Sequence, residues 1–231
     1  MIDPQHVTFP VSESRSEVSG LLLRPADANS LLVLGHGAGA GMNHPFLVAL
    51  ARRLADFGMA TLRYQFPYME EGKRRPDYGA ILQATVRSAV AVAYDLAGGL
   101  PLLAGGKSMG GRMTSLAAAR ESLSEVLGLV FVGFPLHPAG RPGTERAEHL
   151  KDVGRPMLFL QGTRDRLAGL DLLKPVIREL GRNAHLHPVE GGDHSFNMLE
   201  SSGRSRDDAL DELATATTSW AAKVVEESIG R

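Results

Sequence analysis

Short apolar runs alternate along this chain with segments whose apolar residues recur every three or four positions. The apolar runs at residues 31–34, 59–64, 128–133 and 156–161 have the length of buried strands. Helical periodicity appears between them, as it does over residues 77–96. This alternation is typical of a mostly parallel central sheet with helices on both faces. The pattern therefore predicts an α/β fold.

The same rules predict the other elements. We expect further strands over residues 7–11, 18–23, 100–105 and 184–189, and helices over residues 111–120, 170–180 and 206–227. Another helix is expected to begin near Pro45. Residues 68–77 are rich in charge, Gly and Pro and are expected to form a long loop. No insertion is large enough for a separate lid domain, so we expect one domain over residues 1–231.

The pentapeptide Gly-Lys-Ser-Met-Gly at residues 106–110 stands between a predicted strand and a predicted helix. A G-x-S-x-G sequence in that setting is typical of a nucleophile elbow. Gly106 and Gly110 lack side chains, so strand and helix can close tightly around Ser108. The serine hydroxyl then lies at a helix N-terminus, where the dipole and backbone N–H groups favour negative charge. The motif predicts Ser108 as a nucleophile, and an ordinary strand–helix turn is the alternative.

Two phosphate-binding motifs also resemble parts of this chain. A P-loop ends in Gly-Lys-Ser, but it requires a glycine five positions before Gly106, where Pro101 stands. Residues 35–40 match the dinucleotide motif G-x-G-x-x-A, and Asp56 follows about 20 residues later. The ribose-binding acid should end the second strand, whereas Asp56 ends the helix before that strand. Both alternatives are therefore disfavoured.

A serine nucleophile requires a base and a carboxylate that orients the base. Behind a nucleophile elbow the order along the chain is Ser, Asp or Glu, then His. Asp165 directly follows the strand at 156–161, and His194 stands in a Gly-rich turn after the strand at 184–189. This order predicts Asp165 as the acid and His194 as the base. A helix cap and a surface histidine are the structural alternatives, and Asp193 is a weaker candidate for the acid.

Donors for an oxyanion are expected from two backbone segments. One is the N–H of Met109, which follows the predicted nucleophile. The other is a loop of small residues after the strand at 31–34, where Ala38 is the first candidate and Gly37 the second. Loops at the same edge could also wall a pocket, with plain loop packing as the alternative. The side chains expected to contact substrate are His36, Asn43, Tyr64, Phe66, Phe134 and Phe196.

A metal site is not expected. His185 and His187 stand two positions apart on a predicted strand and would face the same way. No third ligand is evident in the sequence, so ordinary strand histidines are favoured. We expect neither a metal nor another cofactor.

Several motifs together resemble those of the α/β-hydrolase superfamily. They are Gly-His-Gly-Ala-Gly at 35–39, Asn-His-Pro-Phe at 43–46, Arg-Tyr-Gln-Phe-Pro-Tyr at 63–68, the elbow at 106–112, Gln-Gly-Thr-Arg-Asp at 161–165 and Gly-Asp-His-Ser-Phe at 192–196. The chain is most similar to a small, lidless branch that includes proteins similar to dienelactone hydrolases and to the KAT8 regulatory complex subunit and testis-expressed hydrolase-like proteins.

The resemblance implies a single-domain α/β-hydrolase fold with Ser108 as nucleophile, His194 as base and Asp165 as acid. Dienelactone hydrolases use cysteine as the nucleophile, so the serine here argues against that substrate. Some members of the branch resemble interaction subunits. A binding or scaffold protein that keeps the fold is therefore the alternative to a serine hydrolase that cleaves a small ester or related acyl compound.

Composition and charge limit the kinds of partner that we expect this protein to bind. The chain has 231 residues, a net charge of −1 and no cysteine, which excludes disulfides and a cysteine nucleophile. Nothing in the charge suggests a nucleic acid or an anionic membrane as a partner. No apolar run approaches the length of a membrane span, and the first residues do not resemble a signal peptide. We expect a cytoplasmic protein with a small-molecule acyl substrate, and the oligomeric state stays open.

Overall fold

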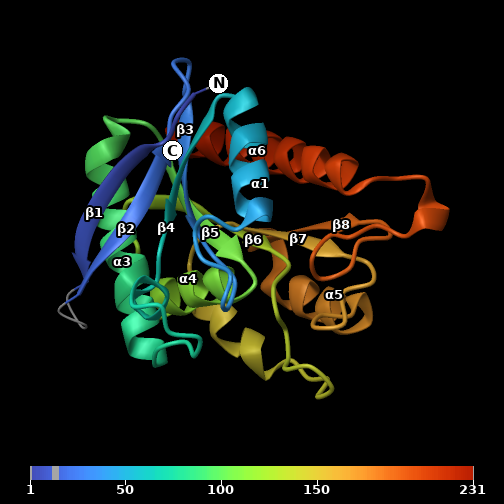
Figure 1. The fold of residues 1–231 in the computed structure, drawn as a ribbon. Helices are drawn as coiled ribbons and strands as arrows, with labels where there is room; N and C mark the ends of the chain where they lie inside the picture. The colour runs from blue at the N-terminus through green and yellow to red at the C-terminus, as the bar shows by residue number, and fades with distance from the viewer. Residues whose placement is uncertain (1, 12–15, 231) are drawn as a thin grey trace.

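The computed structural model describes residues 2–11 and 16–230, and its centre is one eight-stranded sheet (Figure 1). The strand order is β1-β2-β4-β3-β5-β6-β7-β8. β1 pairs with β2, and β2 with β4, in antiparallel fashion, whereas all other neighbours are parallel. The strands are β1 (Gln5–Val11), β2 (Ser16–Leu23), β3 (Ser30–Gly35), β4 (Met59–Tyr64), β5 (Leu102–Lys107), β6 (Val126–Val132), β7 (Met157–Gly162) and β8 (Ala184–Val189).

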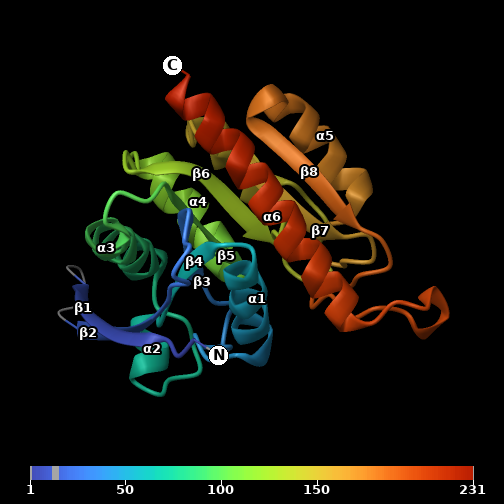
Figure 2. The ribbon, with the colours of Figure 1, turned by 90° about the horizontal axis from the view of Figure 1, so that it is seen from above.

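Helices cover both faces of this sheet, as predicted. They are α1 (Pro45–Asp56), α2 (Pro67–Glu70), α3 (Gly79–Ala97), α4 (Met109–Arg120), α5 (Leu170–Leu180) and α6 (Arg206–Ile229), with 3₁₀ segments at Glu145–Asp152, Gly181–Asn183 and Glu200–Ser202. α1 and α6 lie side by side over one face, and α3, α4 and α5 lie over the other (Figures 1 and 2). No helix in the described residues combines the length and apolar character needed to cross a bilayer.

The two layers follow from the alternation of side chains along the central strands. On β3, Leu31 and Val33 belong to the core under α3 and α4, whereas Leu32 and Leu34 belong to the core under α1 and α6. All six residues of β3 are buried, as expected for a parallel strand covered on both faces. The continuous apolar run in the sequence therefore reflects burial on both sides of the sheet.

Two short segments differ from the prediction. The expected loop at 68–77 begins inside α2, and Tyr68 is fully buried. Pro67 occupies the first turn of α2, where its missing N–H and fixed φ are tolerated. The 3₁₀ segment Glu145–Asp152 was not predicted, because it buries only Ala147 and Leu150 among charged residues and has too few apolar positions to show a period.

The backbones of β5 and α4 approach the backbone of β3 very closely at the predicted elbow. A Cβ atom on Gly110 would lie 2.4 Å from the carbonyl carbon and oxygen of Gly35. A Cβ on Gly106 would lie 2.5 Å from the same oxygen. Because the opposing atoms are backbone, no side chain can move aside to make room. The two glycines of the motif therefore let the strand, the turn and the helix approach within contact distance.

We predict that Gly110→Ala destabilises the fold by about 3 kcal/mol, because the added methyl group overpacks a backbone contact. The matched control is Gly79→Ala in the first turn of α3, where a Cβ would meet only the flexible Gln83 side chain at 3.6 Å. Urea unfolding followed by circular dichroism measures both variants. Equal stability of Gly110→Ala and the wild type would contradict the close approach.

Candidate active site

Ser108 occupies the turn between β5 and α4. Its backbone has φ 50° and ψ −112°, a region that residues other than glycine rarely adopt. The turn is fixed on both sides, since the Ser108 N–H donates to the Val132 carbonyl and the Ser108 carbonyl accepts from the Arg112 N–H, both at 3.1 Å. The strained conformation holds the Ser108 side chain at the N-terminus of α4.

His194 bridges Ser108 and Asp165. Its Nε2 lies 2.9 Å from the Ser108 hydroxyl oxygen, and its Nδ1 lies 2.7 Å from Oδ2 of Asp165. The carboxylate can only accept, so Nδ1 carries the proton and Nε2 is left to accept from the serine hydroxyl. The structure thus brings the three predicted residues, from three separate loops, into one continuous hydrogen-bonded chain.

The Asp165 carboxylate is buried and held by further donors. Its Oδ2 accepts from Nε2 of Gln161 at 2.5 Å, and its Oδ1 accepts from the Leu167 N–H at 2.7 Å. The other end of the Gln161 amide accepts from the Phe134 N–H at 3.0 Å, which ties β7 to the loop after β6. These bonds stabilise the charged carboxylate in a buried position and fix the oxygen that faces His194.

Asp193, the weaker candidate for the acid, accepts hydrogen bonds within its own turn. Its Oδ1 accepts from the N–H groups of Ser195 and Asn197 at 2.8 and 2.9 Å, and its Oδ2 accepts from the Asn197 side chain. These bonds shape the turn that carries His194, and they lower the pKa of Asp193 against an opposing effect of burial. Asp193 therefore stabilises the turn and makes no hydrogen bond to His194.

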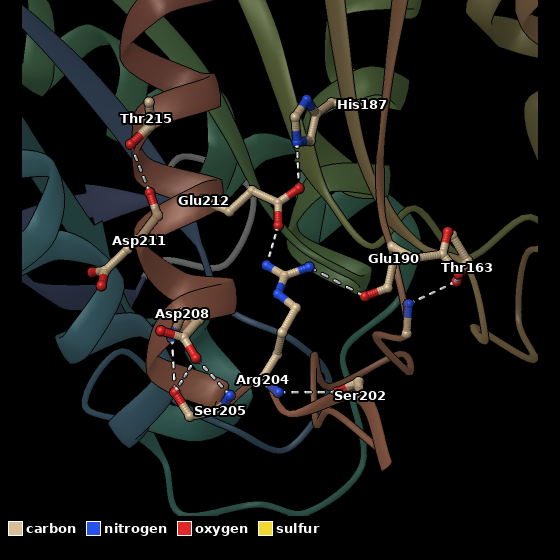
Figure 3. A network of polar contacts seen from close by, with 11 residues as sticks. Thr163, His187, Glu190, Ser202, Arg204, Ser205, Asp208, Asp211, Glu212 and Thr215 are labelled. Carbon is tan, nitrogen blue, oxygen red and sulfur yellow. Dashed lines mark hydrogen bonds and ion pairs between the residues drawn. The ribbon is translucent and has the colours of Figure 1, made fainter. Parts of the chain in front are cut away.

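The segment that carries His194 is anchored where it joins α6 (Figure 3). Arg204 pairs with Glu212 and also donates to the Glu190 carbonyl at 3.3 Å. The other oxygen of Glu212 lies 2.8 Å from Nε2 of His187 on β8. Because one arginine spans from the residue after β8 to the second turn of α6, the loop between them is closed at its base. This restraint limits how far His194 can move from Ser108.

The loop after β3 lies against Ser108 and is tied to the segment after β4. The Phe66 N–H donates to Nε2 of His36 at 3.2 Å, and the Gly39 N–H donates to the Tyr68 hydroxyl at 2.9 Å. In the described residues, the Ala38 N–H makes no hydrogen bond. Ala38 and Gly37 both line the cavity beside Ser108, and their role as oxyanion donors stays a prediction.

A cavity of about 220 Å³ opens beside Ser108 and His194. We call it the Ser108 cavity. Its lining residues are Gly37, Ala38, Ala40, His44, Phe46, Leu47, Lys107, Ser108, His194, Ser195 and Arg206. Small and apolar residues from the loop after β3 and from α1 form much of its surface, and basic side chains and two serines form the rest.

The predicted pocket walls were wrong. His36, Tyr64, Phe66, Phe134 and Phe196 have at most 1% of their surface exposed and do not line the Ser108 cavity. They form the buried support beneath the loops. Phe66 packs edge-on against His36 and Tyr64, Phe134 packs edge-on against Phe131, and Phe196 stacks on Phe46. The remaining residue of that set, Asn43, lines a separate cavity with Arg52 and Arg63.

The sequence prediction missed several side chains of the Ser108 cavity, among them His44, Phe46, Lys107 and Arg206. The elbow motif already contains Lys107, and Phe46 belongs to the apolar stripe of α1. Arg206 could have been noticed because it begins a helix, a position that disfavours cations. Its place beside the serine depends on the fold of the whole chain.

Asp56 and His187, each part of an interpretation that the sequence disfavoured, do not line the Ser108 cavity. Asp56 is the last residue of α1, about 18 Å along the helix axis from its start near the Gly-rich loop. His187 hydrogen bonds to Glu212, as Figure 3 shows. Within the described ranges, no group of three or more His, Cys, Asp or Glu residues is arranged to hold a metal ion.

The fold and the Ser-His-Asp geometry are those of an α/β hydrolase. The family model described as "Alpha/beta hydrolase domain" matches residues 28–222, and the chain belongs to this family.

Solved structures share the fold at low sequence identity. A dienelactone hydrolase from Anabaena variabilis has a TM-score of 0.74 and 22% identity, over 94% of this chain and 97% of that chain. An α/β serine hydrolase without a lid from Xanthomonas campestris has a TM-score of 0.71 and 20% identity, over 94% and 95%. Est1E from Butyrivibrio proteoclasticus has a TM-score of 0.71 and 16% identity, over 97% and 99%. The eight-stranded architecture without a separate lid agrees with these structures.

We predict that stability falls as the pH drops from about 6.5 to about 4, because burial lowers the pKa of His36 from 6.5 to about 4. The unfolded chain binds a proton in that range and the folded chain does not, so the loss amounts to about 3 kcal/mol below both pKa values. Urea midpoints measured along this range should fall less steeply for His36→Gln than for the wild type.

Burial also lowers the pKa of His149 to about 4, so this residue contributes in the same pH range. His149→Gln is therefore the matched comparison, and each single variant should remove part of the slope. If His36→Gln kept the full slope of the wild type, neutral burial of His36 would be contradicted.

Proposed function

We propose that this protein is a serine hydrolase that cleaves small esters or related acyl compounds, with Ser108 as nucleophile, His194 as base and Asp165 as acid. The observation that carries the proposal is the unbroken chain of hydrogen bonds from the Ser108 hydroxyl through His194 to Asp165, at 2.9 and 2.7 Å. Its geometry meets the requirements of nucleophilic catalysis by serine.

In the first half-reaction, Nε2 of His194 takes the Ser108 proton while the hydroxyl oxygen bonds to the substrate carbonyl carbon. The Asp165 carboxylate stabilises the imidazolium that forms. The N–H groups of Met109 and Ala38, with Gly37 as the second choice in the loop, bind the oxyanion of the tetrahedral intermediate. When the intermediate collapses, the bond to the leaving alcohol breaks and His194 gives that group its proton.

In the second half-reaction, water replaces the alcohol. His194 takes a proton from the water as its oxygen bonds to the acyl carbon, and the Ser108 oxygen then leaves with that proton. The products are a carboxylic acid and the free enzyme. The Ser108 cavity of about 220 Å³ favours short acyl substrates over bulky ones.

The comparisons support an ester as the substrate. The similar solved structures include an esterase domain from a Rhodothermus marinus protein and the serine hydrolase from Xanthomonas campestris. A scaffold protein of the same fold would not require a buried carboxylate, an oriented histidine and a strained serine that are linked by hydrogen bonds. We therefore favour the serine hydrolase over the scaffold protein as the function.

We predict that Ser108→Ala lowers kcat for 4-nitrophenyl acetate by at least about 10³-fold, because the nucleophile is lost. Asp165→Asn should lower it by about 10³-fold as well, because the amide favours the wrong tautomer of His194. Release of 4-nitrophenolate, corrected for spontaneous hydrolysis, gives the rates.

The matched control is Ser115→Ala. Ser115 is buried in α4, and its hydroxyl lies 2.7 Å from Nε2 of His149, so it forms a second Ser-His pair away from the Ser108 cavity. Ser115→Ala should keep the activity of the wild type. Activity that survives in Ser108→Ala, or disappears in Ser115→Ala with the fold intact, would contradict the assignment.

A further inference from the structure

Two cations without carboxylate partners border the Ser108 cavity. Lys107 directly precedes Ser108, and its Nζ lies 5.8 Å from the centre of the Phe196 ring. The guanidinium of Arg206 lies 5.6 Å from the centre of the Phe46 ring. Within the part of the chain that the structure describes, neither side chain forms an ion pair.

The acidic residues near Arg206 are engaged elsewhere. Asp207 and Asp211 both pair with Arg53 of α1, at 2.7 and 2.5 Å. Asp208 caps α6 through Ser205. The chain thus neutralises its other cations around the start of α6 and leaves Arg206 with an aromatic ring as its neighbour.

Arg206 also stands where a helix disfavours a cation. It is the first residue of α6, at the positive end of the helix dipole. The next two residues, Asp207 and Asp208, follow the usual preference for acids in a first turn. An unpaired arginine at this position costs stability, and a bound anion would offset that cost.

Lys107 is the more buried of the two cations. Burial lowers its pKa to about 8, while Asp165 and Asp193 oppose that shift. Asp165 already accepts from His194 and Asp193 from its own turn, so neither carboxylate forms an ion pair with the ammonium group. An anion bound inside the cavity would supply the ion-pair partner that Lys107 lacks.

His44 adds a third polar contact beside these cations. Its Nδ1 accepts from the Phe46 N–H at 3.2 Å, so Nε2 carries the proton and can donate to a ligand. Burial lowers the pKa of His44, and the charges of Arg206 and Lys107 lower it further, which keeps the ring neutral. The cavity therefore combines two cations and one neutral donor with an apolar surface from Ala38, Ala40 and Leu47.

We propose that the Ser108 cavity binds short acyl substrates that carry a carboxylate in addition to the scissile ester, and that Lys107 and Arg206 bind this carboxylate. The inference rests on the proposed function, because it concerns the substrate of the same site. The small volume suits a chain of a few methylene groups between the two ends of the substrate. The apolar surface would contact those groups while the cations hold the charged end.

The test compares two esters of equal length, methyl hydrogen succinate and methyl butanoate, which differ by a carboxylate in place of a methyl group. Acid release is followed in a pH-stat with purified full-length protein. We expect kcat/KM for the charged ester to exceed that for the neutral ester by about tenfold or more, since hydrogen bonds to charged groups are the stronger ones. The ratio of the two values is the readout, so a general loss of activity cancels.

Lys107→Met and Arg206→Gln should each lower this ratio by about tenfold, because each removes one cation. The matched controls are Lys174→Met and Arg178→Gln on the exposed side of α5, which remove the same charges away from the cavity and should leave the ratio unchanged. Raising the pH from about 7 to about 9 should lower the ratio in the wild type, because Lys107 loses its proton near pH 8. The ratio of Lys107→Met should not follow this change.

A ratio near or below one in the wild type, with methyl butanoate hydrolysed, would overturn this inference and leave the proposed hydrolase standing. Equal ratios in the wild type and both cavity variants would also overturn it. If neither methyl ester nor 4-nitrophenyl acetate were hydrolysed, the proposed function would fail, and the inference would fail with it. A preference that is lost in the cavity variants and kept in the controls supports it.

Discussion

The candidate site depends on one backbone contact, the approach of Gly106 and Gly110 to Gly35. With only hydrogen atoms at these α-carbons, the start of α4 lies within contact distance of the end of β3. In the turn between β5 and α4 that follows from this approach, Ser108 adopts φ 50°. The packing of the sheet and both cores stabilises this strained turn, which holds a half-buried serine beside the Ser108 cavity at a helix N-terminus.

The parallel strand order brings the remaining groups to the same edge. β3, β5, β7 and β8 all run in one direction, so the loops after them meet there. Each loop contributes one part of the candidate site: the small residues after β3, Ser108 after β5, Asp165 after β7 and His194 after β8. Buried residues such as Gln161 and Tyr68 fix these loops from below, which explains why a site made of loops has a defined geometry.

The sequence allowed prediction of the strands, most helices and the three hydrogen-bonded residues, because those depend on local signals. G-x-S-x-G, an acid after a strand and a histidine in a Gly-rich turn can each be recognised within a few residues. The pocket walls could not be predicted in this way. Whether Phe66 and Phe134 face a cavity or a core depends on how distant loops fold over them, and both proved buried. Arg206 lies 98 positions after Ser108 in the chain, and only the packing of α6 on α1 brings it to the cavity.

The central claim, that His194 activates Ser108, is tested most directly by labelling with a fluorophosphonate and measuring the intact mass with time. We expect one adduct on the wild type, located at Ser108 by peptide mapping. The rate should fall by at least about 100-fold in His194→Gln, because the hydroxyl then lacks its base. No adduct on the folded wild type, or equal labelling rates with and without His194, would contradict the account.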